Sequence, residues 1–332
     1  MKLAIVGVTG LVGQTMLKVI EEFAMPVETL FPVASEASIG KTILFSGSHH
    51  KIISIEKALE NKPDIALFSA GSEVSKQWVP KFASNGTYVI DNSSAWRQHE
   101  EVPLVVPEVN IAILTSSDHI IANPNCSTIQ MVVALAPIHR MYGLKRLVIS
   151  TYQSVTGSGY RGMKQLEMEQ KGQKADKPAY PHPIHLNLIP HGGEFDKDYY
   201  TSEERKLEVE TRKILNVPQL AVTATVVRVP VFGGHSMTVN IETYKPFDLN
   251  DIKKLLEQGQ GIELIDDPLH NQYPMPLFAQ GKDQVIVGRV RRDKSISKGL
   301  NLWVVADNLR KGAATNAVQI AQYIFDNKFF SS

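Results

Sequence analysis

The sequence predicts an α/β protein in which a doubly wound parallel sheet is followed by a second, α+β domain. Three observations carry this prediction: a glycine-rich turn joins the first apolar run to the first helical pattern, short apolar runs then alternate with helical patterns, and longer strand-like runs follow. Short strands that alternate with helices are typical of a parallel sheet, because each crossover between parallel strands uses a helix. The change of pattern places the first domain at residues 1–125 and the second at residues 126–312.

The first domain begins with a mostly apolar run at residues 2–8, as expected for a strand buried on both faces of a sheet. Residues 14–23 then have the spacing of a helix, and residues 313–327 are predicted to be a last helix that packs back on this domain. The pattern between them predicts strands at residues 28–34, 65–69, 88–91 and 120–122 and helices at residues 55–60 and 75–84.

The second domain is predicted to contain longer strands in a meandering sheet with helices on one face. Residues 171–197 are rich in Gly, Pro, His and Lys and are predicted to be an irregular excursion, and Asp248 is the predicted N-cap of the helix that it begins. The predicted strands are residues 145–153, 221–230, 236–243 and 285–292, and the predicted helices are residues 127–141, 202–215 and 248–258.

Composition argues against several classes of protein. The 332 residues contain 35 basic and 34 acidic side chains, so the formal charge of +1 gives no reason to expect nucleic acid or an anionic membrane as a partner. No apolar run approaches the roughly 20 residues of a membrane helix, and the N-terminus reads as a strand rather than a signal peptide. Cys126 is the only cysteine, so no internal disulfide can form, and a reducing cytoplasm is the expected compartment.

The glycine turn Gly7-x-x-Gly10-x-x-Gly13 lies between the first strand and the first helix. Such a turn brings free backbone amides and the positive end of a helix dipole to one place, which suits the pyrophosphate of a dinucleotide in a Rossmann-type domain. The alternative is a tight turn in an unrelated α/β fold. Glu36 follows the second strand, where a carboxylate can accept hydrogen bonds from a ribose 2′-hydroxyl and so favours NAD, unless it is only a solvated loop charge.

Cys126 lies between a predicted strand and a predicted helix. A cysteine at a helix N-terminus is a better nucleophile because the dipole favours the thiolate. The neighbouring Asn125 offers an amide that can stabilise an oxyanion. A buried structural cysteine is the alternative, but its position and neighbours favour catalysis.

A thiolate nucleophile needs a partner for proton transfer, and His235 is the candidate. It follows a glycine turn seven residues after Arg228, so a strand and a turn can direct both side chains into one pocket. A second histidine group, His182, His185 and His191, lies in a proline-rich stretch without a cysteine. We therefore expect no metal site.

Seven segments taken in order resemble the aspartate-semialdehyde dehydrogenase family over nearly the whole chain. They are residues 7–13, 91–97, 105–110, 123–130, 150–157, 228–235 and 307–314. The resemblance implies a second domain of the glyceraldehyde-3-phosphate-dehydrogenase-like kind. It also implies NADP(H)-dependent reduction of L-aspartyl-4-phosphate to L-aspartate-4-semialdehyde with release of phosphate, in lysine, threonine, methionine and diaminopimelate biosynthesis. A homodimer or homotetramer is expected.

The resemblance also implies roles for individual residues. Cys126 matches the residue that forms the acyl-thioester, His235 the acid/base, and Gln153 the glutamine that orients the substrate. Other matching residues are expected to bind the substrate. Arg228 matches an arginine that binds the carboxylate, and Arg97 with Lys206 a basic pair that binds the phosphate. Glu203 matches an acidic residue that contacts the amine, and Asn125 is the asparagine beside the cysteine. Without the resemblance, Glu203 and Lys206 read as a surface ion pair three residues apart on a helix.

The resemblance implies the cofactor-binding residues in the same way. The matching residues form the pyrophosphate turn, the adenosine ribose site and the nicotinamide end, namely Gly7, Thr9, Gly10, Leu11, Val12, Gly13, Ser35, Glu36, Ser38, Thr156, Gly157 and Asn308. Members that prefer NADP usually carry an arginine where this chain has Ala37, so NAD or dual use stays open. Thr156 replaces a usual serine and keeps the hydroxyl.

Two alternatives remain. One is another thioester-forming reductase, N-acetyl-glutamyl-phosphate reductase or glyceraldehyde-3-phosphate dehydrogenase, but the latter usually presents Ser-Cys-Thr-Thr-Asn where this chain has Asn-Cys-Ser-Thr. The other is a nucleotide-binding scaffold that has lost catalysis. The presence of Cys126, Gln153, Arg228 and His235 argues against it.

Overall fold

The computed structural model describes residues 1–330 and divides into two compact units. Unit 1 contains residues 1–125 and the C-terminal segment that starts at Ala313, and unit 2 runs from Cys126 to Gly312. Among the described residues, no helix is both long enough and apolar enough to cross a membrane.

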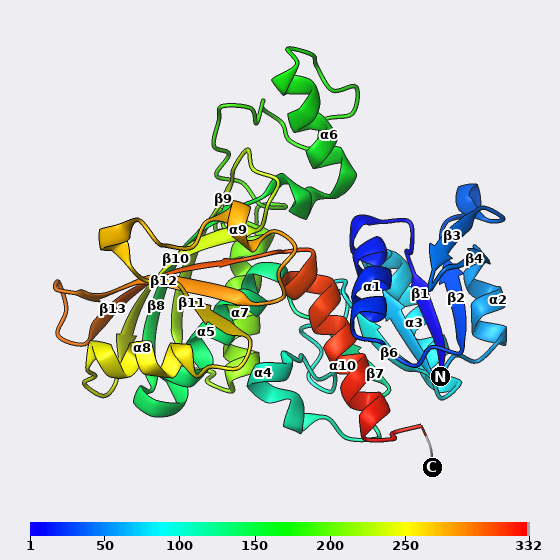
Figure 1. Ribbon diagram of the computed structural model, residues 1–332, viewed down its shortest axis with the longest axis horizontal. Helices are drawn as coiled ribbons and strands as arrows, with labels where there is room; N and C mark the ends of the chain where they lie inside the picture. Colours follow the sequence, from blue (N-terminus) through cyan, green and yellow to red (C-terminus); the bar gives the residue numbers. More distant parts are fainter. Residues whose placement is uncertain (331–332) are drawn as a thin grey trace. The chain divides into compact units, whose positions relative to one another are not determined.

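Unit 1 is built on a five-stranded parallel sheet in the order β2-β1-β5-β6-β7 (Figure 1). The predicted strands of the first domain are confirmed, and residues 88–91 and 120–122 keep the predicted ends. The strands are β1 (Lys2–Val6), β2 (Thr29–Val33), β5 (Ile65–Phe68), β6 (Tyr88–Asp91) and β7 (Ile120–Ala122).

Both faces of this sheet are covered, as a doubly wound fold requires. Leu3 and Ile5 of β1 belong to an apolar cluster that includes side chains of α1 and α10, whereas Ala4 and Val6 belong to a cluster with side chains of α2 and α3. Neighbouring residues of a strand point to opposite faces, so the two clusters lie on opposite sides of the sheet. The helices are α1 (Leu11–Glu22), α2 (Ile55–Glu60), α3 (Ser72–Ser84), α4 (Pro107–Asn110) and α10 (Thr315–Asp326).

Unit 1 also differs from the sequence prediction. The helix predicted at residues 14–23 begins earlier, at Leu11, because the glycine turn itself leads directly into α1. A hairpin of β3 (Thr42–Phe45) and β4 (Ser48–Lys51) was not predicted. Strand β4 (Ser48–Lys51) is polar and mostly exposed, and the apolar run of β3 is shorter than the roughly four to eight residues by which a strand is recognised.

Unit 2 is built on a six-stranded sheet in the order β11-β12-β13-β10-β8-β9. The pairs β8–β9 and β11–β12 are parallel and the other pairs antiparallel, so the sheet is mixed rather than the simple meander that was predicted. The strands are β8 (Leu144–Gln153), β9 (Ala221–Arg228), β10 (His235–Thr243), β11 (Ile262–Leu264), β12 (Val285–Asp293) and β13 (Gly299–Ala306).

The central helix of unit 2 is α5 (Cys126–Tyr142), which is buried along most of its length. Helices α7 (Ser202–Leu215) and α8 (Leu249–Glu257) pack against it, and Asp248 caps α8 as predicted, accepting the Asn250 amide hydrogen. Strands β11 and β13 and helices α6 (Gly159–Gln170) and α9 (Pro276–Ala279) were not predicted. Within the predicted irregular excursion, residues 171–197, the structure has neither helix nor strand.

Candidate active site

Cys126 is the first residue of α5 and is only partly buried. The first turn of α5 contains no acidic side chain to offset the positive end of its dipole, a setting that favours a thiolate. Backbone packs closely against the cysteine: a Cβ built on Gly312 would lie 2.9 Å from the Cys126 Cβ. The thiol therefore occupies a fixed position at a helix N-terminus, as the sequence predicted.

Two glutamine side chains link the first turns of α5 to the rest of the candidate site by hydrogen bonds. The Gln153 amide, at the end of β8, donates a 2.9 Å hydrogen bond to the hydroxyl of Ser127, the residue after the cysteine. One turn further along α5, Gln130 Nε2 donates to the backbone oxygen of His235 at 3.3 Å. Residues four apart share a helix face, so the face that carries Cys126 is the one that meets His235.

The turn that follows β8 holds both His235 and Arg228 through one residue, Ser154. The Ser154 amide donates to His235 Nδ1 at 3.1 Å, and the Ser154 oxygen accepts from Arg228 Nη1 at 2.9 Å. A Cβ built on Gly157 would lie 2.8 Å from Arg228 Nη1 and 3.1 Å from His235 Nε2. The imidazole and the guanidinium therefore both approach the backbone at this glycine, where any side chain would clash with them.

Both side chains are buried with one polar atom unused. Among the described residues, neither His235 Nε2 nor Arg228 Nε has a hydrogen-bond partner. Buried polar atoms are nearly always paired, so these two atoms are suited to a bound ligand. Burial, and then the Arg228 charge, hold the pKa of His235 well below its usual value, so its ring is neutral near pH 7. Because Nδ1 accepts the Ser154 hydrogen, the proton of the neutral ring lies on Nε2.

From the lowered pKa of His235 we predict how the stability of the folded chain depends on pH. The unfolded chain protonates this histidine near pH 6.5 and the folded chain does so only at lower pH, so stability is full above pH 6.5 and falls as the solution is acidified below it. The contribution to the slope reaches up to about 1.4 kcal/mol per pH unit. Urea unfolding from pH 7.5 to pH 5 should therefore show a steeper loss for the wild type than for His235→Asn. Parallel curves would contradict the buried neutral ring.

Glu203 and Lys206 lie in the first turns of α7 and form a 2.6 Å ion pair whose side chains are 16% and 23% exposed. The capping box of Thr201 and Glu204 begins this helix. Glu204 also accepts the amide hydrogen of Val226 at 3.0 Å, which fixes α7 to β9 two residues before Arg228.

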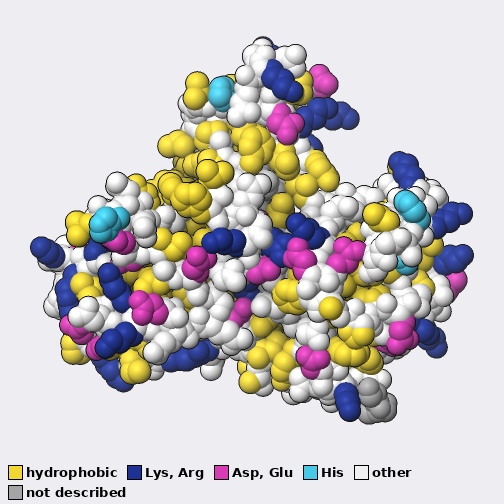
Figure 2. Space-filling view, in the orientation of Figure 1, with side chains coloured by type: hydrophobic (Ala, Val, Ile, Leu, Met, Phe, Trp, Pro, Cys, Tyr) yellow, Lys and Arg dark blue, Asp and Glu magenta, His cyan; other side chains and the backbone are white. Residues whose placement is uncertain are grey.

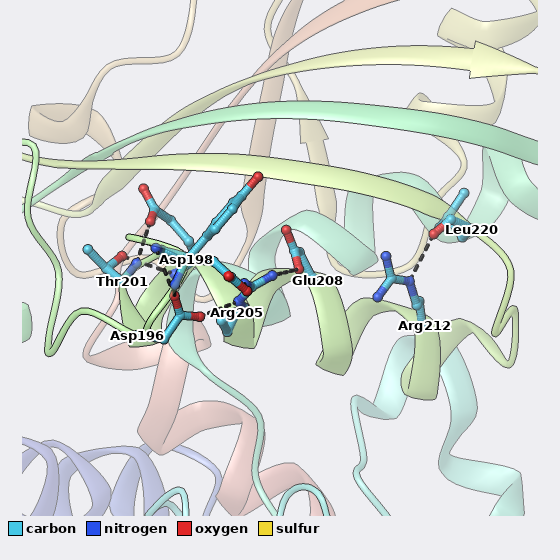
Figure 3. A network of polar contacts seen from close by, with 9 residues as sticks. Asp196, Asp198, Thr201, Arg205, Glu208, Arg212 and Leu220 are labelled. Atoms are coloured by element: carbon cyan, nitrogen blue, oxygen red, sulfur yellow. Dashed lines mark hydrogen bonds and ion pairs between the residues drawn. The ribbon is translucent and has the colours of Figure 1, made fainter.

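A second group of charges holds the segment that precedes α7 (Figure 3). Arg205 bonds to Asp196 at 2.7 Å and to Asp198 at 3.3 Å, and it pairs with Glu208 on its own helix at 3.2 Å. These contacts hold the loop that contains Asp196 and Asp198 against the first turns of α7.

In unit 1 the glycine turn is as tight as its spacing predicts. Gly7 has a φ of +91°, and a Cβ there would lie 2.3 Å from the Ser69 oxygen. A Cβ on Gly13 would lie 2.4 Å from the Gly7 oxygen. Gly10 precedes α1 and has no side chain to cap it, so the first amides of the helix are left for another acceptor.

A cavity of about 480 Å³ lies beside this turn at the carboxyl ends of β1, β2 and β5. The predicted residues Gly7, Ser35 and Glu36 line it, whereas Ser38 does not. Glu56 and Trp78 line it as well and were not predicted, because neither lies in a recognisable motif. Among residues 1–330, no lysine or arginine lines the cavity, whereas two carboxylates do.

Arg97, also in unit 1, is buried against main-chain oxygens. Its Nε donates to the Asn123 oxygen at 2.8 Å and its Nη2 to the Asn92 oxygen at 2.6 Å. The side chain of Asn123 in turn bonds to Asn92 at 2.6 Å and to Asn316 of α10 at 2.7 Å. An asparagine network therefore sets the direction of the guanidinium.

The remaining predicted residues divide between the two units. Thr156 Oγ1 donates to Asn308 Oδ1 at 2.8 Å in unit 2, which brings two of the predicted nicotinamide-side residues together. Asn125 is buried next to the cysteine in the chain. His191 stacks on Phe195, and within residues 1–330 no three His, Cys, Asp or Glu side chains are grouped to hold a metal ion.

Comparison with known proteins shows the family to which the chain belongs. The family profile described as "Semialdehyde dehydrogenase, NAD binding domain" matches residues 2–116, and "Semialdehyde dehydrogenase, dimerisation domain" matches residues 135–311. The aspartate-semialdehyde dehydrogenase of Aquifex aeolicus is 50% identical over 331 residues, which cover 97% of each chain. The chain belongs to the aspartate-semialdehyde dehydrogenase family. Members of this family are oxidoreductases that act on an aldehyde with a nucleotide cofactor.

Solved structures extend the match from sequence to fold. Aspartate semialdehyde dehydrogenase II of Vibrio cholerae, crystallised as a complex with ASA, superposes with a TM-score of 0.93 at 47% identity and 98% coverage of both chains. The family member of Bacillus subtilis is 45% identical over 96% of each chain. The predicted fold class, a Rossmann-type sheet with a second α+β domain, is therefore confirmed.

Proposed function

We propose that this chain reduces L-aspartyl-4-phosphate to L-aspartate-4-semialdehyde, releasing phosphate, through a thioester on Cys126. The observation that carries the proposal is the convergence of a neutral histidine and an arginine, each with an unused buried hydrogen-bonding atom, beside a helix that begins with the only cysteine. A nucleophile, a proton carrier and a carboxylate-binding fork are what acyl transfer to and from such a substrate needs.

In the proposed sequence, the Cys126 thiolate attacks the acyl carbon. The sulfur–carbon bond forms, the carbon–oxygen bond to phosphate breaks, and phosphate leaves the thioester behind. When bound, the reduced nicotinamide cofactor supplies a hydride. Hydride addition to the thioester carbon gives the oxyanion of a thiohemiacetal, and as its carbonyl re-forms the sulfur–carbon bond breaks, which releases the aldehyde and restores the thiolate.

His235 carries its proton on Nε2, which has no hydrogen-bond partner among the described residues, and so can donate a hydrogen bond to the substrate oxygen as negative charge develops there. We assign Gln153, through its bond to Ser127, to orienting the intermediate over the first turn of α5. The Asn125 amide is proposed as a further donor to the same oxygen.

The charged ends of the substrate fix its orientation, which can lower a barrier by several kcal/mol. Arg228 is proposed to bind the α-carboxylate, because its Nε and a planar fork are available in a buried setting. Arg97 and Lys206 are proposed to bind the phosphate and Glu203 the amine. The short Glu203–Lys206 pair must then open or share its charge when the substrate binds.

Unit 1 fits a dinucleotide, because Gly7 and Gly13 permit the tight turn and the close packing of α1 that leave the first amides of the helix for a pyrophosphate. The proposed contacts are Thr9, Gly10, Leu11 and Val12 at the pyrophosphate, Ser35, Glu36 and Ser38 near the ribose, and Thr156, Gly157 and Asn308 toward the nicotinamide. NADP(H) is the cofactor that the resemblance implies. Since Glu36 and Glu56 line the ribose-side cavity without a cation, we propose that NAD(H) is used as well.

Ala37→Arg should shift this cofactor preference toward NADP. Ala37 is exposed beside Glu36, so an arginine there can reach the 2′-phosphate, and charge-assisted hydrogen bonds of about 1.5–3 kcal/mol correspond to roughly 10- to 150-fold. The measurement is the ratio of kcat/KM for NADP to that for NAD. Ala37→Gln, which adds length without charge, is the control and should change the ratio little. An unchanged ratio in the arginine variant would exclude this position from 2′-phosphate recognition.

The reaction itself is tested by initial rates with aspartate semialdehyde, phosphate and either nucleotide. Turnover should require phosphate. Without phosphate, one equivalent of reduced nucleotide per active site should form as the acyl group stays on the sulfur. Faster oxidation of N-acetylglutamate semialdehyde or glyceraldehyde 3-phosphate would instead assign the chain to a related reductase.

The product would serve lysine, threonine, methionine and diaminopimelate biosynthesis in the cytoplasm, where a single thiol stays reduced. We propose a homodimer or a homotetramer formed through unit 2. Exposed large apolar side chains occur in its excursion, including Leu186, Leu188 and Phe195. Figure 2 shows apolar side chains gathered at the base of the lobe that carries α6.

A further inference from the structure

Tyr180 lies in the irregular excursion after α6, yet it is 8% exposed and contacts the candidate active site. The Cζ atom of Arg228 lies 5.9 Å from the centre of its ring, within the range of a cation–π interaction. Its hydroxyl donates to Ser158 Oγ at 2.9 Å, at the end of the turn whose first residue, Ser154, bonds to both Arg228 and His235.

The excursion is held in place by two side chains of α6, one turn apart. Gln165 Oε1 accepts the amide hydrogens of Ala179 at 2.7 Å and of Tyr180 at 3.0 Å. Glu169 Oε2 accepts those of Ile184 at 2.7 Å and His185 at 2.8 Å. Gln165 is almost fully buried and also bonds to Glu169, so the segment from residue 179 to residue 185 has a fixed path despite having no regular structure.

The ring of Tyr180 is seated from the other sides as well. It belongs to an apolar cluster with Val155, Leu166 and Ile184. A Cβ on Gly162 would lie 2.9 Å from the Tyr180 oxygen, so α6 approaches the hydroxyl closely at this glycine. Burial raises the pKa of Tyr180, so the phenol keeps the proton that it donates to Ser158.

We propose that Tyr180 is a positioning residue for substrate recognition, whose ring face holds the Arg228 guanidinium in the direction that binds the substrate carboxylate. Within residues 1–330, the Arg228 side chain makes one hydrogen bond, from Nη1 to the Ser154 oxygen, and a single bond leaves the guanidinium free to rotate about it. The ring supplies the second restraint. Through Gln165 and Glu169, the order of the excursion is then coupled to carboxylate recognition. This inference rests on the proposed role of Arg228.

The test compares aspartate semialdehyde with 3-aminopropanal, which has the same aldehyde and amine but no carboxylate. Tyr180→Leu should lower kcat/KM for aspartate semialdehyde about tenfold, mainly through KM, and leave 3-aminopropanal nearly unchanged. Tyr180→Phe keeps the ring and should stay within about threefold of the wild type. Tyr160→Leu, at an exposed tyrosine of α6, is the matched control and should change neither substrate.

Equal losses for both substrates in Tyr180→Leu would overturn the proposal, as would a loss in Tyr180→Phe as large as that in the leucine variant. Should Tyr180→Leu fail to fold, phenylalanines with increasing fluorination at position 180 keep the shape and weaken the ring face. Discrimination should then fall stepwise, and a flat series would refute the cation–π role. Wild-type turnover of aspartate semialdehyde separates these outcomes from a failure of the proposed reaction.

Discussion

Cys126→Ala should abolish turnover of aspartate semialdehyde, with a loss on the order of 10⁴-fold or more in kcat, while the protein stays folded. Alanine removes only Sγ and keeps the Cβ that packs against Gly312, so neither the start of α5 nor the close approach of residue 312 has to change. Because the cysteine is only partly buried, little apolar contact is lost.

The measurement is kcat for the phosphate-dependent reaction, together with the midpoint of thermal unfolding and the affinity for the nucleotide. Both of the latter should stay near their wild-type values, since the glycine turn and the cavity belong to unit 1. In the wild type, mass spectrometry of enzyme quenched without phosphate should find an aspartyl group on Cys126. Phosphate-dependent turnover by the alanine variant would rule out covalent catalysis at this position.

The sequence allowed much of this site to be predicted, because its chemistry lies in motifs with a local signature. A cysteine at a strand–helix junction, a glycine turn after a first strand and a histidine after Gly-Gly are each visible in a few consecutive residues. The strands of the parallel sheet were likewise predicted, because burial on both faces makes them continuously apolar.

The parts that could not be predicted depend on main-chain contacts and on residues far apart in the chain. Ser154 holds Arg228 and His235 through its backbone amide and oxygen, which any residue type could supply. Tyr180 lies in a stretch without periodicity, and its position depends on hydrogen bonds from that stretch to Gln165 and Glu169 of α6. Strand β4 is polar and mostly exposed, β3 has only a short apolar run, and β13 was not predicted although its residues are largely buried.

Arg228→Lys should cost about 1.5–3 kcal/mol of substrate binding, which is roughly 10- to 150-fold in kcat/KM for aspartate semialdehyde. A lysine ammonium keeps the charge but loses the planar fork, so it cannot donate to Ser154 and to both carboxylate oxygens at once. The arginine Nε, which is buried and has no hydrogen-bond partner in the described part of the chain, is the donor that the substrate would lose. The larger change is expected in KM, because the carboxylate is bound throughout the reaction.

Arg205→Lys in the same unit is the matched control. Arg205 pairs with exposed or partly exposed acids, and such ion pairs contribute about 0–1 kcal/mol, so the kinetics of Arg205→Lys should stay close to those of the wild type.

Combining Arg228→Lys with Tyr180→Leu then shows whether the two residues act together in binding the carboxylate or act separately. If the ring acts by holding the guanidinium, the double variant should lose less than the product of the two single losses. A near-normal KM in Arg228→Lys would contradict the proposed role of Arg228 and would indicate that another cation binds the substrate carboxylate.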